Sequence, residues 1–400
     1  RSPRHTMSTS RFDLRRRTVD DVRFVDTTTF HEEMVPALQE VNGELAARSF
    51  RNSGLESIVI AVDGIDHTWD LDESGALRVR QGDLGRARAE LSADWFSDLV
   101  GNVRSAVAVL VSGEPVMARG NIMHLIAWET TIRSLMDGWP SYEPGAIAFV
   151  DRKGEPLDLT RRFRLDDDPQ EIMHFLAQTG FLLLEGVFSE DEVAVMNDAV
   201  TAMHAAARPD DDRTWYATVA GHDEPQCVRV NDLPEDSLGI SMTDRLGGFI
   251  AWAEAGHQFD HIDVLMKPVD VVEGISDLPW HKDCSLGLHS FQCLQLVCGV
   301  SLTASGPDNG QLGVVAGSHR INLDQFGLSS DIDLPQVFVS TRPGDVTVHT
   351  SCTLHCSTPP IHSPRRVAYS TFMLEGDTSA LEARIRGVRD QAGRETFAPS

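Results

Sequence analysis

Residues with metal-binding chemistry lie close together in the C-terminal half of the sequence. His281 and Asp283 are separated by one residue in the segment LPWHKDCSLGLHS. On an extended strand, residues i and i+2 point to the same side, so both side chains would approach one metal while Lys282 turns aside. A histidine from a distant strand would complete two imidazoles and one carboxylate, a set that leaves open positions on iron(II). His349 and His355 are the candidates for that place.

Strand-like and helical patterns around these residues indicate how they are positioned. The segment RVAYSTFML, which follows both candidate histidines, is rich in residues that favour strands. Before the cluster, the apolar run ending at Phe188 predicts a strand, and Ser189 with Glu192 three residues later predicts a capped helix. We therefore expect a β-rich C-terminal half with flanking helices.

The order of these segments resembles the phytanoyl-CoA dioxygenase family over about residues 168–375. The resemblance rests on GFLLLEGVFS, on the His-x-Asp pair, on PDNGQLGVVAGSHR, and on a Gly-Asp turn followed by His-x-Ser and an arginine. It implies a double-stranded β-helix, the cupin-like jelly roll, with the site at the mouth of the barrel. It also implies an enzyme that uses iron(II), 2-oxoglutarate and dioxygen.

The resemblance also selects among the candidate ligands. In this family the distal histidine follows a Gly-Asp turn, here Gly344-Asp345. We predict His355 as the third ligand because Ser357 follows two residues later, and His349 is the alternative. The predicted metal site is therefore His281, Asp283 and His355.

Four further residues are predicted to contact 2-oxoglutarate. Arg366 follows His355 by eleven residues and would hold the far carboxylate as a two-pronged clamp, with Ser357 donating a hydroxyl hydrogen bond. Arg365 is expected to point the other way. Arg229 and Lys282 are weaker candidates, because the match around Arg229 is short and relatives usually carry Gln where Lys282 stands.

The six cysteines lie between Cys227 and Cys356. Four of them, Cys284, Cys293, Cys352 and Cys356, are near the predicted site and suggest zinc, which thiolates favour. Because the sequence contains no Cys-x-x-Cys pair, we interpret them as reduced, buried thiols.

The N-terminal half has a different pattern. Residues 57–91 alternate as four short strands, predicting a small antiparallel sheet, and helical patterns follow from Ser92 and from Ile122. Residues 30–140 resemble the sterol carrier protein type 2 family, which implies an α+β fold and a possible lipid site. We predict an N-terminal segment (1–29, partly disordered or tag-derived), this α+β domain (30–145), a linker (146–167) and the oxygenase domain (168–400).

Composition limits the partners. The net charge of −25 and the lack of a basic stripe exclude a nucleic-acid partner, and no apolar run is long enough to span a membrane. We expect a cytoplasmic protein whose oligomeric state the sequence does not indicate. The expected activity is hydroxylation of an unactivated carbon in a small, hydrophobic molecule such as a lipid, sterol or terpenoid. The alternative is a non-catalytic lipid carrier with a degenerate oxygenase domain.

Overall fold

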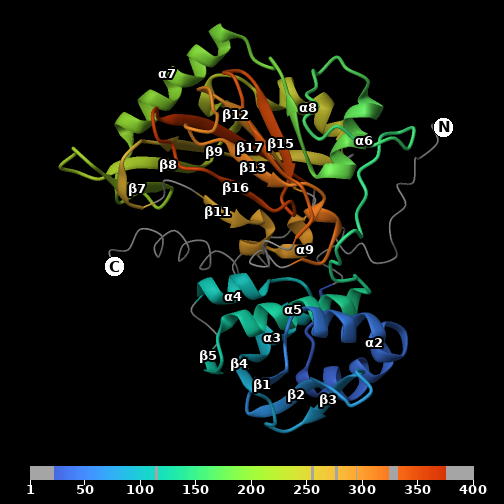
Figure 1. Cartoon of the computed structure of the whole chain (residues 1–400). Helices are drawn as coiled ribbons and strands as arrows, with labels where there is room; N and C mark the ends of the chain where they lie inside the picture. The colour runs from blue at the N-terminus through green and yellow to red at the C-terminus, as the bar shows by residue number, and fades with distance from the viewer. Residues whose placement is uncertain are drawn as a thin grey trace.

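Two halves, each built from helices and sheet, follow one another along the chain (Figure 1). The computed structural model describes residues 22–112, 116–253, 256–274, 278–293, 295–323 and 332–374. Most of the predicted N-terminal segment therefore lies outside the described residues. Within them, no helix has both the length and the apolar character that crossing a bilayer requires.

The N-terminal half contains one five-stranded sheet with the order β3-β2-β1-β4-β5. Its strands are β1 (Ser57–Val62), β2 (Ile65–Leu71), β3 (Leu77–Gln81), β4 (Ala87–Leu91) and β5 (Val116–Arg119). The four strands predicted in residues 57–91 are confirmed. The prediction of a purely antiparallel sheet is wrong, because β1 pairs with β4 in parallel. The chain from β3 to β4 returns to the far side of β1, which makes the sheet mixed.

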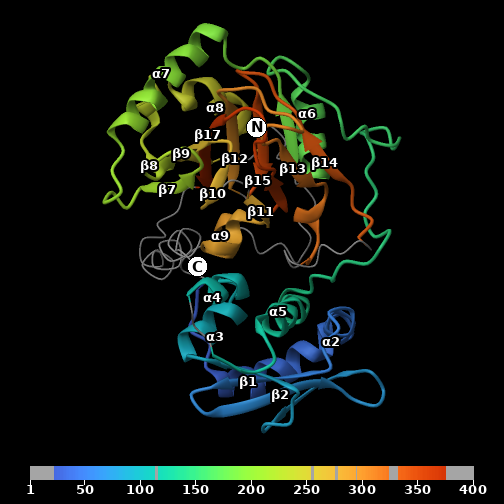
Figure 2. The same cartoon turned by 60° about the vertical axis from the view of Figure 1, so that its left-hand side comes forward.

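Helices cover the face of this sheet that is turned toward the C-terminal half (Figures 1 and 2). The helices of this half are α1 (Thr27–Thr29), the π-helix η2 (Phe30–Met34), α2 (Val35–Asn52), α3 (Ala93–Val100), α4 (Ala106–Ser112) and α5 (Ile122–Asp137). Ser92 caps α3 by accepting a hydrogen bond from the Trp95 amide, as predicted. Trp69 and Trp128 pack edge to face in the core between the sheet and these helices. This half therefore has its own hydrophobic core.

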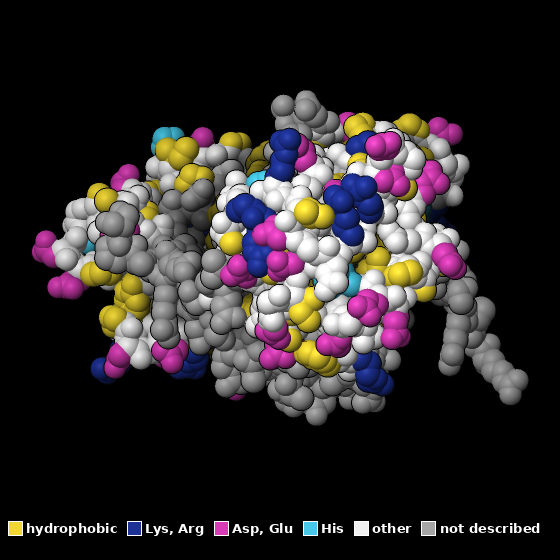
Figure 3. Space-filling model, turned by 90° about the horizontal axis from the view of Figure 1, so that it is seen from below, with side chains coloured by type: hydrophobic (Ala, Val, Ile, Leu, Met, Phe, Trp, Pro, Cys, Tyr) yellow, Lys and Arg dark blue, Asp and Glu magenta, His cyan; other side chains and the backbone are white. Residues whose placement is uncertain are grey.

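The face seen in Figure 3 carries basic and acidic side chains in alternation. Asp70 on β2 pairs with Arg78 and Arg80 on β3, and Arg88 on β4 pairs with Asp66. These three arginines are paired with neighbouring acids, which reduces the positive potential around them.

The C-terminal half contains two further antiparallel sheets. The larger has the order β10-β7-β8-β9-β17-β12-β15-β6 and the smaller the order β11-β16-β13-β14. Its strands are β6 (Phe181–Leu184), β7 (Thr214–Val219), β8 (Gln226–Leu233), β9 (His257–Lys267), β10 (Val271–Glu273), β11 (Leu278–His281), β12 (Leu296–Ser301), β13 (Leu312–Val315), β14 (Gln336–Val339), β15 (Val346–Thr350), β16 (His355–Ser357) and β17 (Arg365–Leu374). From β11 to β17 the chain passes repeatedly between the two sheets, which is the jelly-roll arrangement.

Helices and apolar side chains complete this half. The helices are α6 (Pro169–Thr179), α7 (Glu190–Ala206), α8 (Met242–Ala253) and α9 (His289–Gln292), with the 3-10 turns η3 (Glu235–Leu238), η4 (Asp283–Leu286) and η5 (Ser318–Arg320). The capping box of Ser189 and Glu192 is present at the start of α7, as predicted. One apolar cluster joins the sheets, with Leu312 and Val314 from the smaller and Val346 and Val348 from the larger.

The turn before β15 requires glycine. Gly344 has φ +89°, and a Cβ there would lie 2.2 Å from the carbonyl oxygen of Phe188. We expect Gly344→Ala to lower the free energy of unfolding by about 2–4 kcal/mol, because backbone strain and a steric clash add. Gly221→Ala is the control, since Gly221 has φ +81° and nothing within 4 Å of its Cβ position. Its cost should be about 1 kcal/mol in urea denaturation. Equal losses in the two variants would contradict the clash.

Candidate active site

His281, Asp283 and His355, the three predicted ligands, lie close together in the structure. Each offers one ligand atom, and these atoms all lie within 4.8 Å of one another. The Nε2 atom of His281 lies 3.3 Å from Asp283 Oδ1, and the Nε2 atom of His355 lies 3.5 Å from the same oxygen. His281 ends β11 and pairs in register with His355 on β16, while Asp283 opens the turn η4. Strand pairing therefore brings together ligands that are 74 positions apart in the sequence.

Backbone carbonyls orient both imidazoles. His281 Nδ1 lies 2.7 Å from the Pro279 oxygen, and His355 Nδ1 lies 2.9 Å from the Thr353 oxygen. A carbonyl oxygen only accepts, so both Nδ1 atoms carry the proton and donate. The lone pair of each ring is then on Nε2, which faces Asp283. Such contacts typically fix the tautomer of metal-binding histidines.

The charge states suit a cation. Burial and the charges of His349 and His281 keep the pKa of His355 well below its usual range, so this ring is neutral and can act as a ligand. Burial alone would raise the pKa of Asp283, but the neighbouring imidazoles hold it well below the usual range for a carboxyl group. The point shared by the three residues therefore offers two imidazole nitrogens and one carboxylate.

His349, the alternative ligand, also reaches this cluster. Its Nε2 lies 3.2 Å from Oδ2 of Asp283, the oxygen turned away from His281 and His355. Its Nδ1 is buried and has no hydrogen-bond partner among the described residues. With no carbonyl to hold a proton on Nδ1, the ring can carry it on Nε2 and donate to Asp283. This geometry suits a residue that orients the carboxylate.

A second group of polar side chains lies beside the three candidate ligands. Ser357, two residues after His355 on β16, accepts hydrogen bonds from Lys267 Nζ at 2.8 Å and from Arg365 Nη1 at 3.0 Å. Lys267 and Arg365 are 2% and 1% exposed and face each other across β9 and β17. Two buried cations that meet at one hydroxyl create a strongly positive spot, which favours an anionic ligand.

The prediction that Arg366 lies beside Ser357 is wrong. Its Nη1 atom donates to Thr201 Oγ1 at 3.0 Å and lies 3.5 Å from Asn197 Oδ1, both on α7 outside the jelly roll. Arg365, expected to point away, occupies the place predicted for Arg366. The reason is the alternation of β17: Arg365 shares its face with Tyr369 and Thr371, which line the cavity described below.

Lys282 also lies elsewhere than predicted. It is buried and lines a small pocket together with His289 and Cys352, on the side away from His281. The turn of this side chain away from the cluster follows the i, i+2 alternation that brings His281 and Asp283 together.

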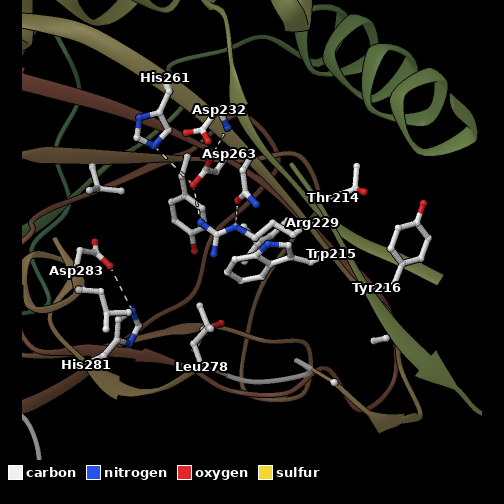
Figure 4. Close-up of a pocket in the computed structure, with 18 of the residues that line it drawn as sticks. Thr214, Trp215, Tyr216, Arg229, Asp232, His261, Asp263, Leu278, His281 and Asp283 are labelled. Carbon is white, nitrogen blue, oxygen red and sulfur yellow. Dashed lines mark hydrogen bonds and ion pairs between the residues drawn. The ribbon is translucent and has the colours of Figure 1, made fainter. Parts of the chain in front are cut away.

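A cavity of about 800 Å³ opens above the three candidate ligands. Leu265, Leu278, Val297 and Leu312 supply apolar surface, and His281, Asp283, His355 and Ser357 line one end. Figure 4 shows His281 and Asp283 on one side of this space. On the other side it shows a polar group that consists of Arg229, His261 and Asp263. That group contains Arg229, predicted as a co-substrate contact, which bonds Asp263 and lies over the Trp215 ring. Arg229 therefore lies across the cavity from His281 and Asp283.

Residues 176–367 match the phytanoyl-CoA dioxygenase (PhyH) family. The match spans just under half of the chain and contains the three candidate ligands, Ser357, Lys267 and Arg365. It does not reach the N-terminal half.

Several solved structures are similar to part of the chain. AviO1 from Streptomyces viridochromogenes Tue57 is 22% identical with a TM-score of 0.41, over 52% of this chain and 95% of AviO1. EctD from S. alaskensis is 21% identical with a TM-score of 0.43, over 59% of this chain and 87% of EctD. The alpha-ketoglutarate-dependent epimerase SnoN from nogalamycin biosynthesis is 19% identical with a TM-score of 0.42, over 52% and 83%. Similarity at this level assigns no activity to this chain. None of the curated proteins matches it.

Two residues of the polar group were missed by the sequence analysis. His261 and Asp263 alternate with Leu265 and Lys267 along β9, so all four side chains point to the same side. The sequence signal is the pair of polar residues His261 and Asp263 on one face of β9, with Ile262, Val264 and Met266 apolar on the other face. These residues lie outside the motifs that resemble the dioxygenase family.

His261 should make stability depend on pH. Burial would lower its pKa, but hydrogen bonds to Asp260 and Asp263 outweigh burial and raise the pKa to about 9. Because this folded-state pKa exceeds the unfolded value of about 6.5, the stabilisation is complete below pH ~6.5 and is lost as pH rises through ~9. We expect wild type to exceed His261→Gln by up to about 3 kcal/mol at pH 6, with the difference shrinking by pH 9.5. Urea denaturation at both values measures it. A difference that does not vary with pH would contradict the protonated form.

Proposed function

We propose that this chain is an iron(II)- and 2-oxoglutarate-dependent dioxygenase that hydroxylates an unactivated carbon of a small molecule. The observation that carries the proposal is the meeting of His281, Asp283 and His355 at the end of a cavity, beside the buried cations Lys267 and Arg365. The PhyH match over residues 176–367 supports an oxygenase.

The donor set fits iron(II). Two imidazoles and one carboxylate on one side of a metal form the facial triad of non-heme iron oxygenases, which leaves coordination positions free. Here His281, Asp283 and His355 would hold the iron, and His349 would fix the second oxygen of Asp283. The chemistry supplied by iron and 2-oxoglutarate when bound is the oxidation of a C–H bond by dioxygen, with succinate and carbon dioxide released.

The residues near Ser357 fit the far carboxylate of 2-oxoglutarate. Arg365 can present two N–H groups to a carboxylate, and Lys267 adds a second positive charge. The Ser357 hydroxyl, held between them, would donate to the same carboxylate once an anion replaces the Gly310 carbonyl as its acceptor. We propose this trio, in place of Arg366 and Lys282, as the co-substrate anchor.

The cavity walls suggest a substrate that is hydrophobic along one side. Leu278, Val297 and Leu312 would pack against an apolar body near the metal end. Arg229 and Asp263 at the opposite wall would bind a hydroxyl, carbonyl or similar polar group. This supports a lipid, sterol-like or terpenoid molecule that carries an oxygen function.

The resemblance of the N-terminal half to sterol carrier proteins remains a prediction. Its sheet and helices enclose a core that includes Trp69, Trp128 and Phe50, each fully buried. We propose it as a separate domain, joined to the oxygenase domain by residues 146–167.

Succinate formation tests the proposal. The full chain is incubated with iron(II), 2-oxoglutarate and oxygen, with hydrophobic candidates in one arm and polar amino acids in another. We expect succinate to rise with one hydrophobic class and to stay at background in Asp283→Ala. Equal stimulation by polar amino acids would contradict the substrate class. Failure to consume 2-oxoglutarate with any candidate would favour the lipid carrier.

A further inference from the structure

Three cysteines from separate segments meet behind the proposed iron site. Cys284 lies in η4, Cys293 follows α9, and Cys352 lies in the turn between β15 and β16. Their Sγ atoms lie within 4.8 Å of one another, and the residues are 0%, 2% and 1% exposed. Cys356, the fourth cysteine in this part of the sequence, is not a member of the group. Folding therefore selects three of the four thiols that the sequence analysis interpreted as inert.

The spacing of these sulfurs is compatible with one shared metal ion. In a tetrahedral zinc site with Zn–S distances of about 2.3 Å, neighbouring sulfurs are about 3.8 Å apart. The three sulfurs here all lie within 4.8 Å of one another, so they can share one such ion. All three are free cysteines, and a disulfide would use only two of them.

His289 lies beside the group. Its Nδ1 is 3.9 Å from Cys293 Sγ, about the length of an edge of such a tetrahedron. The same nitrogen lies 2.9 Å from Asn102 Oδ1 in the N-terminal half. Metal binding would require the ring to reorient, so that one nitrogen faces the metal and the other faces Asn102, the usual arrangement of metal-binding histidines.

A buried lysine lies beside the cysteine group. Lys282 lines one small pocket together with His289 and Cys352. Zinc bound by three thiolates and one histidine carries a net charge of −1, which the Lys282 ammonium would neutralise. This charge balance would account for a buried lysine at position 282, which lies away from the proposed 2-oxoglutarate site.

We propose that Cys284, Cys293 and Cys352 bind a structural Zn²⁺ ion, with His289 as the fourth ligand. Soft thiolates select zinc, and four protein ligands close the site to substrate. The ion would link η4, which begins with Asp283, to the turn that leads into His355.

The same ion would also stabilise the contact between the two halves. The His289 amide donates to the Val103 carbonyl at 2.9 Å, and the Ser105 hydroxyl donates to the Ser285 carbonyl at 2.7 Å. Both contacts involve the segment that carries Cys284 and Cys293. A metal that fixes this segment therefore fixes the surface that the N-terminal half contacts.

Metal analysis of the full chain tests the proposal. After a carboxylate chelator has removed weakly held metal, we expect one zinc ion per chain, released when a mercurial reagent blocks the thiols. Cys284→Ser, Cys293→Ser and Cys352→Ser should each lose it, and His289→Ala should retain less than wild type. Cys298→Ser is the matched control, because Cys298 is equally buried but outside the group. His281→Ala should keep zinc, which separates this site from the iron site.

A second measurement covers variants that fail to fold. Wild-type chain prepared with Co²⁺ in place of zinc should show an intense near-ultraviolet thiolate-to-cobalt band, which needs no substitution. Wild type without chelator-resistant zinc and without that band would overturn the proposal. An intact mass two hydrogens below the reduced value would also overturn it, because it would show a disulfide. Equal zinc loss from Cys298→Ser would do the same.

Discussion

Replacing Arg365 by alanine is expected to raise the KM for 2-oxoglutarate about 10- to 100-fold. The reason is the loss of charge-assisted hydrogen bonds to a carboxylate, worth about 1.5–3 kcal/mol each. Arg365 is almost fully buried beside Ser357 and Lys267, so water cannot replace these bonds. Steady-state kinetics of 2-oxoglutarate consumption, with iron saturating, measures the effect.

The control for this prediction is its neighbour. Arg366→Ala should change the KM for 2-oxoglutarate less than about twofold, because Arg366 contacts Thr201 and Asn197 on α7. Surface substitutions of this kind usually change stability by less than about 0.5 kcal/mol. If Arg366→Ala raised the KM and Arg365→Ala did not, the assignment from the structure would be wrong and the prediction from the sequence right.

Replacing His355 by alanine is expected to abolish iron(II) binding, whereas His349→Asn should weaken it by about 10- to 100-fold. His355 would lose a metal ligand, but His349 would lose only a hydrogen bond to Asp283, and outer contacts of this kind have effects of that size. Equilibrium dialysis with iron(II) under anaerobic conditions measures both affinities.

The two histidines are a matched pair, because both are buried and both face Asp283. Circular dichroism at matched concentration checks that each variant is folded. Tighter iron binding by His355→Ala than by His349→Asn would show that His349 is the third ligand, the alternative that the sequence left open.

Two of the three candidate ligands could be placed together from the sequence because their spacing is local. His281 and Asp283 differ by two positions, and alternation along an extended chain alone brings them to one side. The strand in fact ends at His281 and a 3-10 turn begins at Asp283, but Lys282 keeps an extended backbone with φ −116° and ψ 127°. The side chains of His281 and Asp283 therefore still point to the same side, although the strand ends between them.

The choice between Arg365 and Arg366 could not be made from the sequence. A strand with one buried face shows which residues point inward, but β17 is buried on both faces, as Val367 and Ala368 are both fully covered. Only the number of residues between His355 and β17 then indicates which arginine faces Ser357. A difference of one residue in the loop after Ser357 would reverse the direction of every side chain of the strand. Lys267 was missed for another reason, since β9 lies about 90 positions before its partner Ser357.

The cysteine group shows the same limit for long-range contacts. Cys284 and Cys293 are separated by eight residues and Cys352 follows much later, a spacing unlike the short pairs that mark zinc sites in sequences. Only the pairing of β11 with β16 brings the turn that contains Cys352 to η4. Lys282, which the sequence predicted as a co-substrate contact, lines a small pocket with Cys352 and His289 instead.

The central claim is that His281, Asp283 and His355 share one iron(II) ion to which 2-oxoglutarate binds. An anaerobic titration of the full chain with iron(II) and 2-oxoglutarate, followed by visible absorption, tests it most directly. We predict a weak charge-transfer band that appears only when both are present and is missing in His281→Ala, Asp283→Ala and His355→Ala. A wild-type chain that stays colourless, or a band that persists in all three variants, would contradict the claim.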